Sequence, residues 1–169
     1  ILAGQYERQK ALLTQSEIKL LHAQVNPHFL FNALNTLKAV IRRDSEQASQ
    51  LVQYLSTFFR KNLKRPSEIV TLADEVEHVN AYLQIEKARF QENLQVQLHV
   101  PDELAHIRLP AFTLQPIVEN AIKHGTSLGM SLVDKRLRTR FGDDCGINVA
   151  CEPDIFTRIT LRLPLEENA

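Results

Sequence analysis

The sequence predicts an α+β chain with an N-terminal helical part and a mixed second part. Residues 1–64 carry apolar side chains at the three-, four- and seven-residue spacing of amphipathic helices, with one interruption at Pro27. Pro66 follows a basic helix end, and beyond it segments with helical spacing are mixed with segments in which apolar and polar residues alternate. We therefore expect residues 1–66 and residues 67–169 to form two domains.

The N-terminal part is predicted to begin as one helical stretch, over residues 1–43, with a kink. Pro27 has no backbone N–H to donate, so the helix is interrupted there. After the kink the helical spacing resumes, and His28, Asn32 and Asn35 share one polar face of the helix.

A second helix is predicted over residues 46–64, with Asp44 at its start and a basic last turn that suits the helix dipole. Two helices joined by a short loop indicate an antiparallel hairpin. The pair carries more apolar surface than one hairpin can bury. We therefore expect a homodimer in which the N-terminal helices of two copies form a four-helix bundle.

The second part is predicted to contain three helices and three strands. Thr71 followed by Asp74 resembles a capping box at the start of the first helix. The predicted helices cover residues 71–89, 114–124 and 132–141. The predicted strands, recognised by alternation, cover residues 93–100, 147–151 and 156–163. This mixture favours helices packed on one face of a sheet.

Composition excludes several classes of protein. The 169 residues are 44% hydrophobic and 24% charged, which excludes collagen-like, low-complexity and disulfide-scaffold proteins. Five glycines are few, which argues against a site built on several glycine-rich phosphate loops. Basic and acidic residues number 20 each, so we expect no direct nucleic-acid partner. Two cysteines and no signal peptide favour a reducing compartment.

His28 is the first candidate for chemistry. It follows the proline kink on the polar face of an otherwise apolar helix, and Asn32 stands one turn later. An imidazole that accepts a phosphoryl group needs one exposed, neutral nitrogen and a partner that orients the other nitrogen. The polar face can supply both, and a purely structural histidine is the alternative. No histidine lies three or four residues from another histidine or a cysteine, so a metal site of that kind is not predicted.

Residues 119–125 form the second candidate. Asn120, Lys123 and His124 project from one helix face at i, i+3 and i+4. An amide oxygen can ligate Mg²⁺, a lysine one turn away can neutralise phosphate, and Glu119 can orient water or the metal shell. The alternative is a solvated helix end in which Lys123 and His124 interact with the terminal carbonyls.

Together these two groups resemble the LytS/YehU-type sensor histidine kinases, with the YehU branch looking closest. The runs that carry the resemblance are PHFLFN at residues 27–32 and ENAIKHG at residues 119–125. The matching boxes are the phosphoacceptor box at 24–37, the linker at 82–90, the N box at 114–125 and the lid-closing box at 128–137. The resemblance extends from about residue 18 to residue 163.

The resemblance implies an ATP-dependent protein-histidine kinase of a two-component system. Residues 1–66 would form the dimerisation and phosphotransfer region, and residues 67–169 a Bergerat-type (GHKL) ATP-binding α/β sandwich. His28, with Asn32 beside it, would accept the γ-phosphoryl group of ATP and pass it to an aspartate of a LytTR-type response regulator. The resemblance also implies a sensor anchored in the cell membrane, of which this chain would be the cytoplasmic part. No run of eighteen apolar residues is present and the sequence begins at Ile1, so we expect a fragment whose membrane anchor precedes it.

The resemblance also implies roles around the nucleotide. Asn120 would hold Mg²⁺ on the phosphates, Lys123 would contact phosphate, and Gly129 would let the backbone approach the phosphates. The nucleotide-binding residues implied in this way are Asn120, Lys123, His124, Gly125 and Gly129, with Glu119 as a catalytic residue.

The sequence departs from the family between residues 127 and 128. An Asp-x-Gly-x-Gly box that reads adenine, a strand pair and a flexible lid belong there, so the shortage of glycine is local. Three explanations stay open: a mobile lid absent from the sequence, a deliberately shortened chain, or a natural deletion. Phe29 replaces the acid that commoner kinases carry, which leaves the base for His28 unidentified, and Leu132 replaces a common asparagine.

Two other functions compete with the kinase. One is a non-catalytic, dimerising regulatory module with a degenerate ATP-binding lobe. The other is a related ATPase or serine kinase of the same superfold, which needs no phosphoacceptor histidine and leaves residues 27–32 unexplained.

Overall fold

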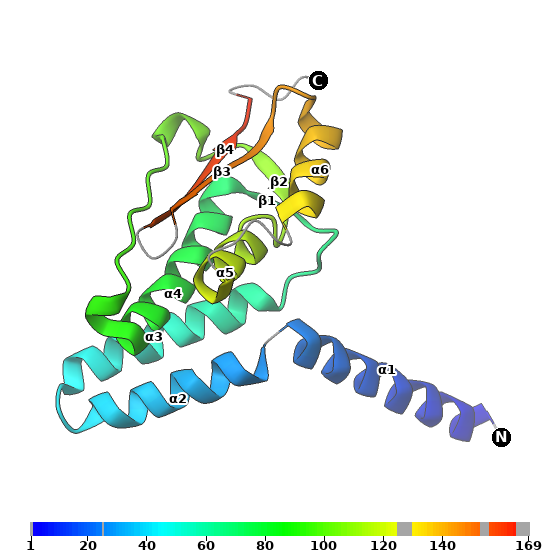
Figure 1. The fold of residues 1–169 in the computed structure, drawn as a ribbon. Coiled ribbons are helices and arrows are strands. Elements are labelled where there is room, and N and C mark those ends of the chain that lie inside the picture. Colours follow the sequence, from blue (N-terminus) through cyan, green and yellow to red (C-terminus); the bar gives the residue numbers. More distant parts are fainter. Residues whose placement is uncertain (1, 25, 125–129, 153–155, 165–169) are drawn as a thin grey trace. The chain divides into compact units, whose positions relative to one another are not determined.

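The computed structural model describes residues 2–24, 26–124, 130–152 and 156–164, and its mixture of helices and strands confirms the α+β class (Figure 1). The helices are α1 (Leu2–Gln24), α2 (Pro27–Ile41), α3 (Ser45–Asn62), α4 (Leu72–Phe90), α5 (Gln115–His124) and α6 (Met130–Phe141). The strands are β1 (Ile69–Thr71), β2 (Arg108–Pro110), β3 (Gly146–Glu152) and β4 (Phe156–Arg162). Short 3₁₀ turns cover Gln91–Asn93 and Asp102–Leu104.

The chain divides into two compact units that do not follow a single boundary in the sequence. The first unit comprises residues 1–64 and 81–95, and the second comprises residues 65–80 and 96–169. The first half of α4 therefore belongs to the second unit, and its second half to the first. Among the described residues, no helix has both the length and the apolar character needed to cross a bilayer.

The first unit confirms the predicted helix starts. Asn26 caps α2 by accepting a hydrogen bond from the backbone N–H of His28 at 3.0 Å, and Pro27 occupies the first turn, where no donor is needed. Asp44 caps α3 by accepting the N–H of Gln47 at 3.0 Å. The short connection folds α2 and α3 into the predicted hairpin, which Figure 1 shows side by side.

Two apolar clusters hold the first unit together. Val40, Ala48 and Leu51 are buried where the hairpin turns, with Leu37 and Ala88 packed against them. Toward the open end of the hairpin lie three buried aromatic rings. The ring of Phe29 lies 4.9 Å from that of Phe58 and 5.0 Å from that of Tyr82. Because Tyr82 and Ala88 belong to α4, the second half of that helix covers the hairpin.

The second unit begins with a short antiparallel pair, β1 and β2, that the sequence analysis did not predict. Val70 lies opposite Leu109, and both are buried. The first N–H groups of α4 are satisfied next to this pair, because Leu72 donates to the carbonyl of Ile107 at 2.7 Å. The hydroxyl of Thr71 accepts the N–H of Asp74, which confirms the predicted helix start.

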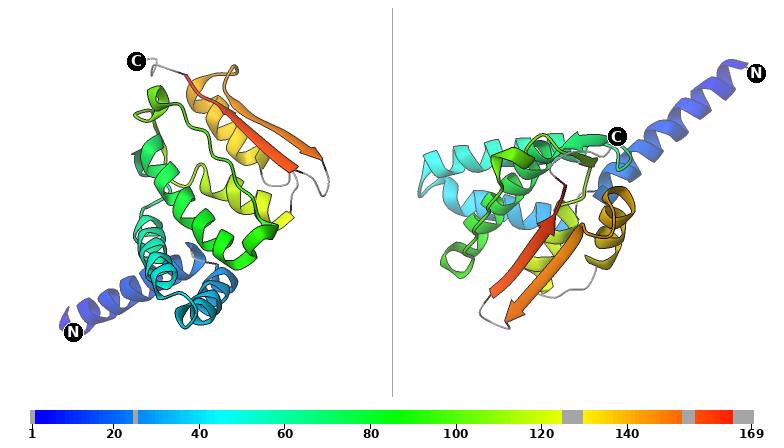
Figure 2. Two further views of the ribbon diagram at one scale, coloured as in Figure 1. Left: turned by 90° about the vertical axis from the view of Figure 1, so that its left-hand side faces the viewer. Right: turned by 90° about the horizontal axis from the view of Figure 1, so that it is seen from above.

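The remainder of the second unit confirms helices packed on one face of a sheet. β3 and β4 pair antiparallel, with Gly146 opposite Arg162. Alternate residues of the sheet face the helices, and α6 runs beside β3 (Figure 2). The core of this layer is made by Ile117 of α5, Val133 and Leu137 of α6, and Phe141, Ile147, Ile159, Leu161 and Leu163 packed against them.

The strand predicted over residues 93–100 is wrong. After the 3₁₀ turn at Gln91–Asn93, residues 94–100 pair with no strand among the described residues. The predicted alternation of buried and exposed side chains is nevertheless present at the start of the segment. Leu94 and Val96 are partly buried, while the glutamines beside them are exposed. Alternation thus marks an extended segment, but a strand also needs a neighbour that supplies hydrogen bonds. The predicted gap between residues 127 and 128 lies outside the described residues.

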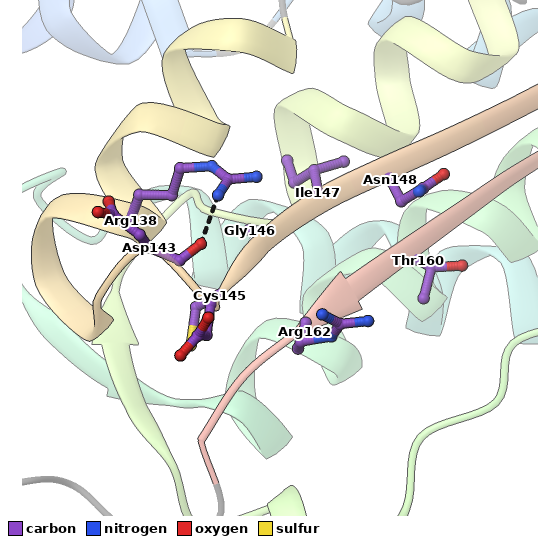
Figure 3. A pocket seen from close by; sticks show the side chains of 9 residues that line it. Arg138, Asp143, Cys145, Gly146, Ile147, Asn148, Thr160 and Arg162 are labelled. Carbon is purple, nitrogen blue, oxygen red and sulfur yellow. Dashed lines mark hydrogen bonds between the residues drawn. The ribbon is translucent and has the colours of Figure 1, made fainter.

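The junction between α6 and β3 is held by the carboxylate of Asp134. Its Oδ2 accepts a hydrogen bond from Arg138 Nε at 2.8 Å, and its Oδ1 accepts the N–H of Ile147 at 2.7 Å. These bonds, that of Arg138 first, lower the pKa of Asp134 below its ordinary value. Arg138 also donates to the carbonyl of Asp143, as the dashed line in Figure 3 shows.

We expect Gly146→Ala to lower the free energy of unfolding by about 1–3 kcal/mol. Gly146 has φ +138°, and an added Cβ would overlap Asp134 Oδ1 and lie 3.0 Å from Arg138 Nη2. Urea denaturation monitored by circular dichroism measures the change. Gly142→Ala is the matched control, because Gly142 has φ +104° with open space around it and so tests backbone strain alone. Equal losses in both variants would contradict the steric explanation.

Candidate functional site

His28 stands on an anchored turn at the start of α2. Its backbone N–H is bound by the Asn26 side chain, and the next residue, Phe29, is buried among the aromatic rings of the first unit. The side chain of His28 is exposed. The backbone of this residue is therefore held in place while its imidazole is open to solvent.

Asn32 lies one turn along the same face and contacts the imidazole. Its Nδ2 is 3.2 Å from His28 Nδ1 and 3.5 Å from Nε2. The i, i+4 spacing thus brings the two side chains together, whereas Asn35 is exposed farther along the helix. The two ends of an amide interchange by a half-turn, so Asn32 can either donate to an unprotonated Nδ1 or accept from a protonated one.

The second candidate group lies on α5. Glu119 and Asn120 are half-buried and Lys123 is exposed, with Asn120 and Lys123 on one face at i, i+3. The buried side chain of Gln115 donates from Nε2 to Glu119 Oε1 at 3.0 Å and so fixes this carboxylate. His124 ends α5, and its side chain lies outside the described part. Gly125 and Gly129 lie outside the described residues altogether.

The turn that precedes α5 is bound by a residue that sequence reasoning missed. Glu75, in the first turn of α4, is 3% exposed. Its carboxylate accepts the backbone N–H groups of Phe112, Thr113 and Leu114 at 3.1, 2.9 and 3.0 Å. These groups are 37 to 39 residues away from Glu75 in sequence, so no local sequence pattern predicts the contact.

Two pockets that lie within the described residues are not lined by the predicted site residues. One, of about 210 Å³, lies at the α6–β3 junction and is lined by charged and polar groups, among them Arg138, Asp144 and Arg162 (Figure 3). The other, of about 240 Å³, lies in the first unit beside Tyr54 and Lys87. Among the described residues, no three His, Cys, Asp or Glu side chains gather as they would around a metal ion.

Comparisons with known proteins find similarity to histidine kinases. The histidine kinase family model matches residues 16–94, which include His28 and Asn32. The sensor histidine kinase BtsS of Escherichia coli (strain K12) is 70% identical over 207 residues, which cover 100% of this chain. The sensor protein LytS of Staphylococcus haemolyticus is 48% identical and that of Bacillus subtilis 46% identical, each over 122 residues and 72% of this chain.

The chain spans only part of these relatives, namely 37% of BtsS and 21% of either LytS protein. The alignment with BtsS also runs over 207 residues while the chain has 169, so 38 residues of that stretch have no counterpart here. The aligned stretch nevertheless includes the whole of this chain at an average identity of 70%. The chain is therefore a relative of the LytS- and BtsS-type sensor histidine kinases, matching a part of their length.

Proposed function

We propose that the protein is an ATP-dependent histidine kinase of a two-component system. His28 accepts the γ-phosphoryl group of ATP and passes it to an aspartate of a LytTR-type response regulator. One observation carries the proposal: an exposed imidazole on an anchored helical turn, with one ring nitrogen in contact with Asn32. This geometry occurs in the segment that matches the histidine kinase family model.

The contact with Asn32 defines how the imidazole can act as a nucleophile. With the amide oxygen of Asn32 turned toward Nδ1, that nitrogen keeps its proton and Nε2 carries the free electron pair. Attack by Nε2 forms an N–P bond and breaks the bond between the γ-phosphorus and the oxygen that bridges to the β-phosphate, so ADP leaves. The ring becomes positively charged, and the amide oxygen stabilises the proton on Nδ1.

The residues of α5 fit the nucleotide side of this reaction. Magnesium at nucleotide sites takes few ligands from the protein and the rest from phosphate oxygens and water, and the amide oxygen of Asn120 can supply one protein ligand. Lys123 supplies positive charge one turn later, and Glu119 is held by Gln115. We assign ATP and Mg²⁺ to this face, with His124, Gly125 and Gly129 beside the nucleotide, within a GHKL-type domain at residues 67–169.

The hairpin carries an apolar face that supports dimerisation through residues 1–66. Large apolar side chains of α2, of α3 and of Leu63, which directly follows α3, remain more than half exposed in the single chain. They are Phe31 (64%), Leu34 (51%), Ile41 (55%), Val52 (52%) and Leu63 (64%). A second copy would bury them in a four-helix bundle, as we propose. We further propose that the chain is the cytoplasmic part of a membrane-anchored sensor.

A nucleotide titration tests the proposal. We expect the protein to bind Mg·ATP, and Asn120→Ala to weaken that binding by about 10- to 100-fold or more, because a metal-bound oxygen is lost. Isothermal titration calorimetry measures the affinity, and the difference between the proteins should vanish in EDTA. Asn148→Ala, at an exposed asparagine of β3, is the matched control.

One observation favours a second candidate, a non-catalytic regulatory module. The aligned stretch of BtsS has 38 residues without a counterpart here, and the sequence lacks the lid and the adenine-reading box expected of the family. We place this difference between residues 127 and 128. A wild-type chain that binds no nucleotide would support the regulatory module and overturn the kinase.

A further inference from the structure

We infer that Glu75 is a positioning residue for the nucleotide site, because its carboxylate fixes the turn from which α5 starts. The inference concerns a contact between the first turn of α4 and residues 112–114, all within the second unit. Its bearing on nucleotide binding rests on the function proposed above for α5.

The contact consists of three charge-assisted hydrogen bonds from backbone N–H groups to one carboxylate. Oε1 of Glu75 accepts one backbone N–H, that of Phe112, and Oε2 accepts two, those of Thr113 and Leu114, at distances between 2.9 and 3.1 Å. The carboxylate is buried, so water does not compete for these donors. A carboxylate accepts hydrogen bonds on both oxygens and presents no donor of its own. The amide of a glutamine would turn an NH₂ group toward N–H donors.

The bound turn has a backbone conformation that needs such support. Phe112 has φ +60°, a left-handed conformation that a bulky side chain rarely adopts. The ring of His78, one turn after Glu75 on α4, meets the ring of Phe112 edge-on at 5.7 Å. Ala111 donates to the carbonyl of Glu68 at 2.8 Å, which ties the other side of the turn. The turn is thus fixed from α4 and from the segment before β1.

The position of the turn determines where the face of α5 points. Helix α5 begins at Gln115, directly after the three bound N–H groups, and its first turn is closed by the bond from Val118 to the carbonyl of Leu114. Asn120 and Lys123 follow within the next two turns. Because a helix is stiff over ten residues, a shift of its first turn displaces both side chains together.

Hydrogen exchange without nucleotide tests the positioning directly. In Glu75→Gln we expect the backbone N–H groups of residues 112–115, 117 and 118 to exchange at least about tenfold faster than in the wild-type protein, because charge-assisted bonds are lost. Glu77→Gln is the matched control, since Glu77 is an exposed glutamate two residues along α4. Unchanged exchange in Glu75→Gln would overturn the inference even if nucleotide binds as proposed.

Nucleotide affinity tests the consequence for the site. Glu75→Gln should weaken Mg·ATP binding by about 10- to 100-fold at a temperature at which every variant is folded. Ile107→Val, a buried substitution in the same unit, should lower the melting temperature without changing the affinity. If the Mg·ATP affinity fell in proportion to the melting temperature in both variants, Glu75 would contribute only to stability, and its assignment as a positioning residue would be wrong. If the wild-type protein binds no nucleotide, the proposed function fails, and the exchange experiment still decides whether Glu75 holds the turn.

Discussion

Replacing His28 by glutamine is expected to abolish phosphorylation of the protein by γ-labelled ATP. Glutamine keeps a polar side chain at the start of α2 and leaves the cap made by Asn26 intact, because that cap binds the backbone. It lacks a ring nitrogen with a free electron pair, so no N–P bond can form. Loss of a nucleophile commonly lowers a rate by at least about 10³-fold, so label should fall to background.

The chemical stability of the label identifies the acceptor. A phosphoryl group on histidine is lost in acid and retained in base, and it should be absent from the His28→Gln protein. His99→Gln is the matched control, because His99 is an exposed histidine outside both candidate groups. Acid-labile label that persists without His28 would refute the assignment of the phosphoacceptor.

Replacing Phe58 by alanine is expected to lower the free energy of unfolding by about 3–5 kcal/mol. Phe58 is 2% exposed and its ring lies 4.9 Å from that of Phe29 and 6.0 Å from that of Tyr82. Its removal leaves a cavity between α2, α3 and the second half of α4, and it takes away aromatic contacts beyond the buried area. Urea denaturation at equilibrium measures the loss.

Phe156→Ala is the control for this substitution. Phe156 is 43% exposed at the start of β4, in the other unit, so its truncation should cost no more than about 1 kcal/mol. If the two variants lost the same stability, the three-ring cluster would not be the main support of the first unit.

Local chemistry made the helices of this protein predictable. Asn26, Asp44 and Thr71 cap helices through atoms two or three residues away, so each start can be predicted from a short stretch of sequence. The same holds for His28 and Asn32, whose contact needs only one turn of helix. These features depend on spacing within a single element.

Features that join distant parts of the chain were not predictable in this way. The β1–β2 pair joins residues nearly forty positions apart, and Glu75 reaches Phe112 over 37 positions. Residues 94–100 show the opposite case. Their alternating pattern is typical of a strand, but they pair with no strand among the described residues, and a strand needs a neighbour for its hydrogen bonds. Hydrogen bonds between distant residues are thus the part of the candidate site on α5 that local sequence patterns do not predict.

The carboxylate-bound turn before α5 also bears on the entropy of ligand binding. Residues 112–114 are already held by Glu75 when no ligand is bound, so their backbone freedom is lost during folding and not again when a ligand arrives. A ligand on α5 would then lose less affinity to ordering than it would on a flexible loop. The proposed nucleotide site would in this way link the stability of the folded unit to the strength of binding through one buried glutamate.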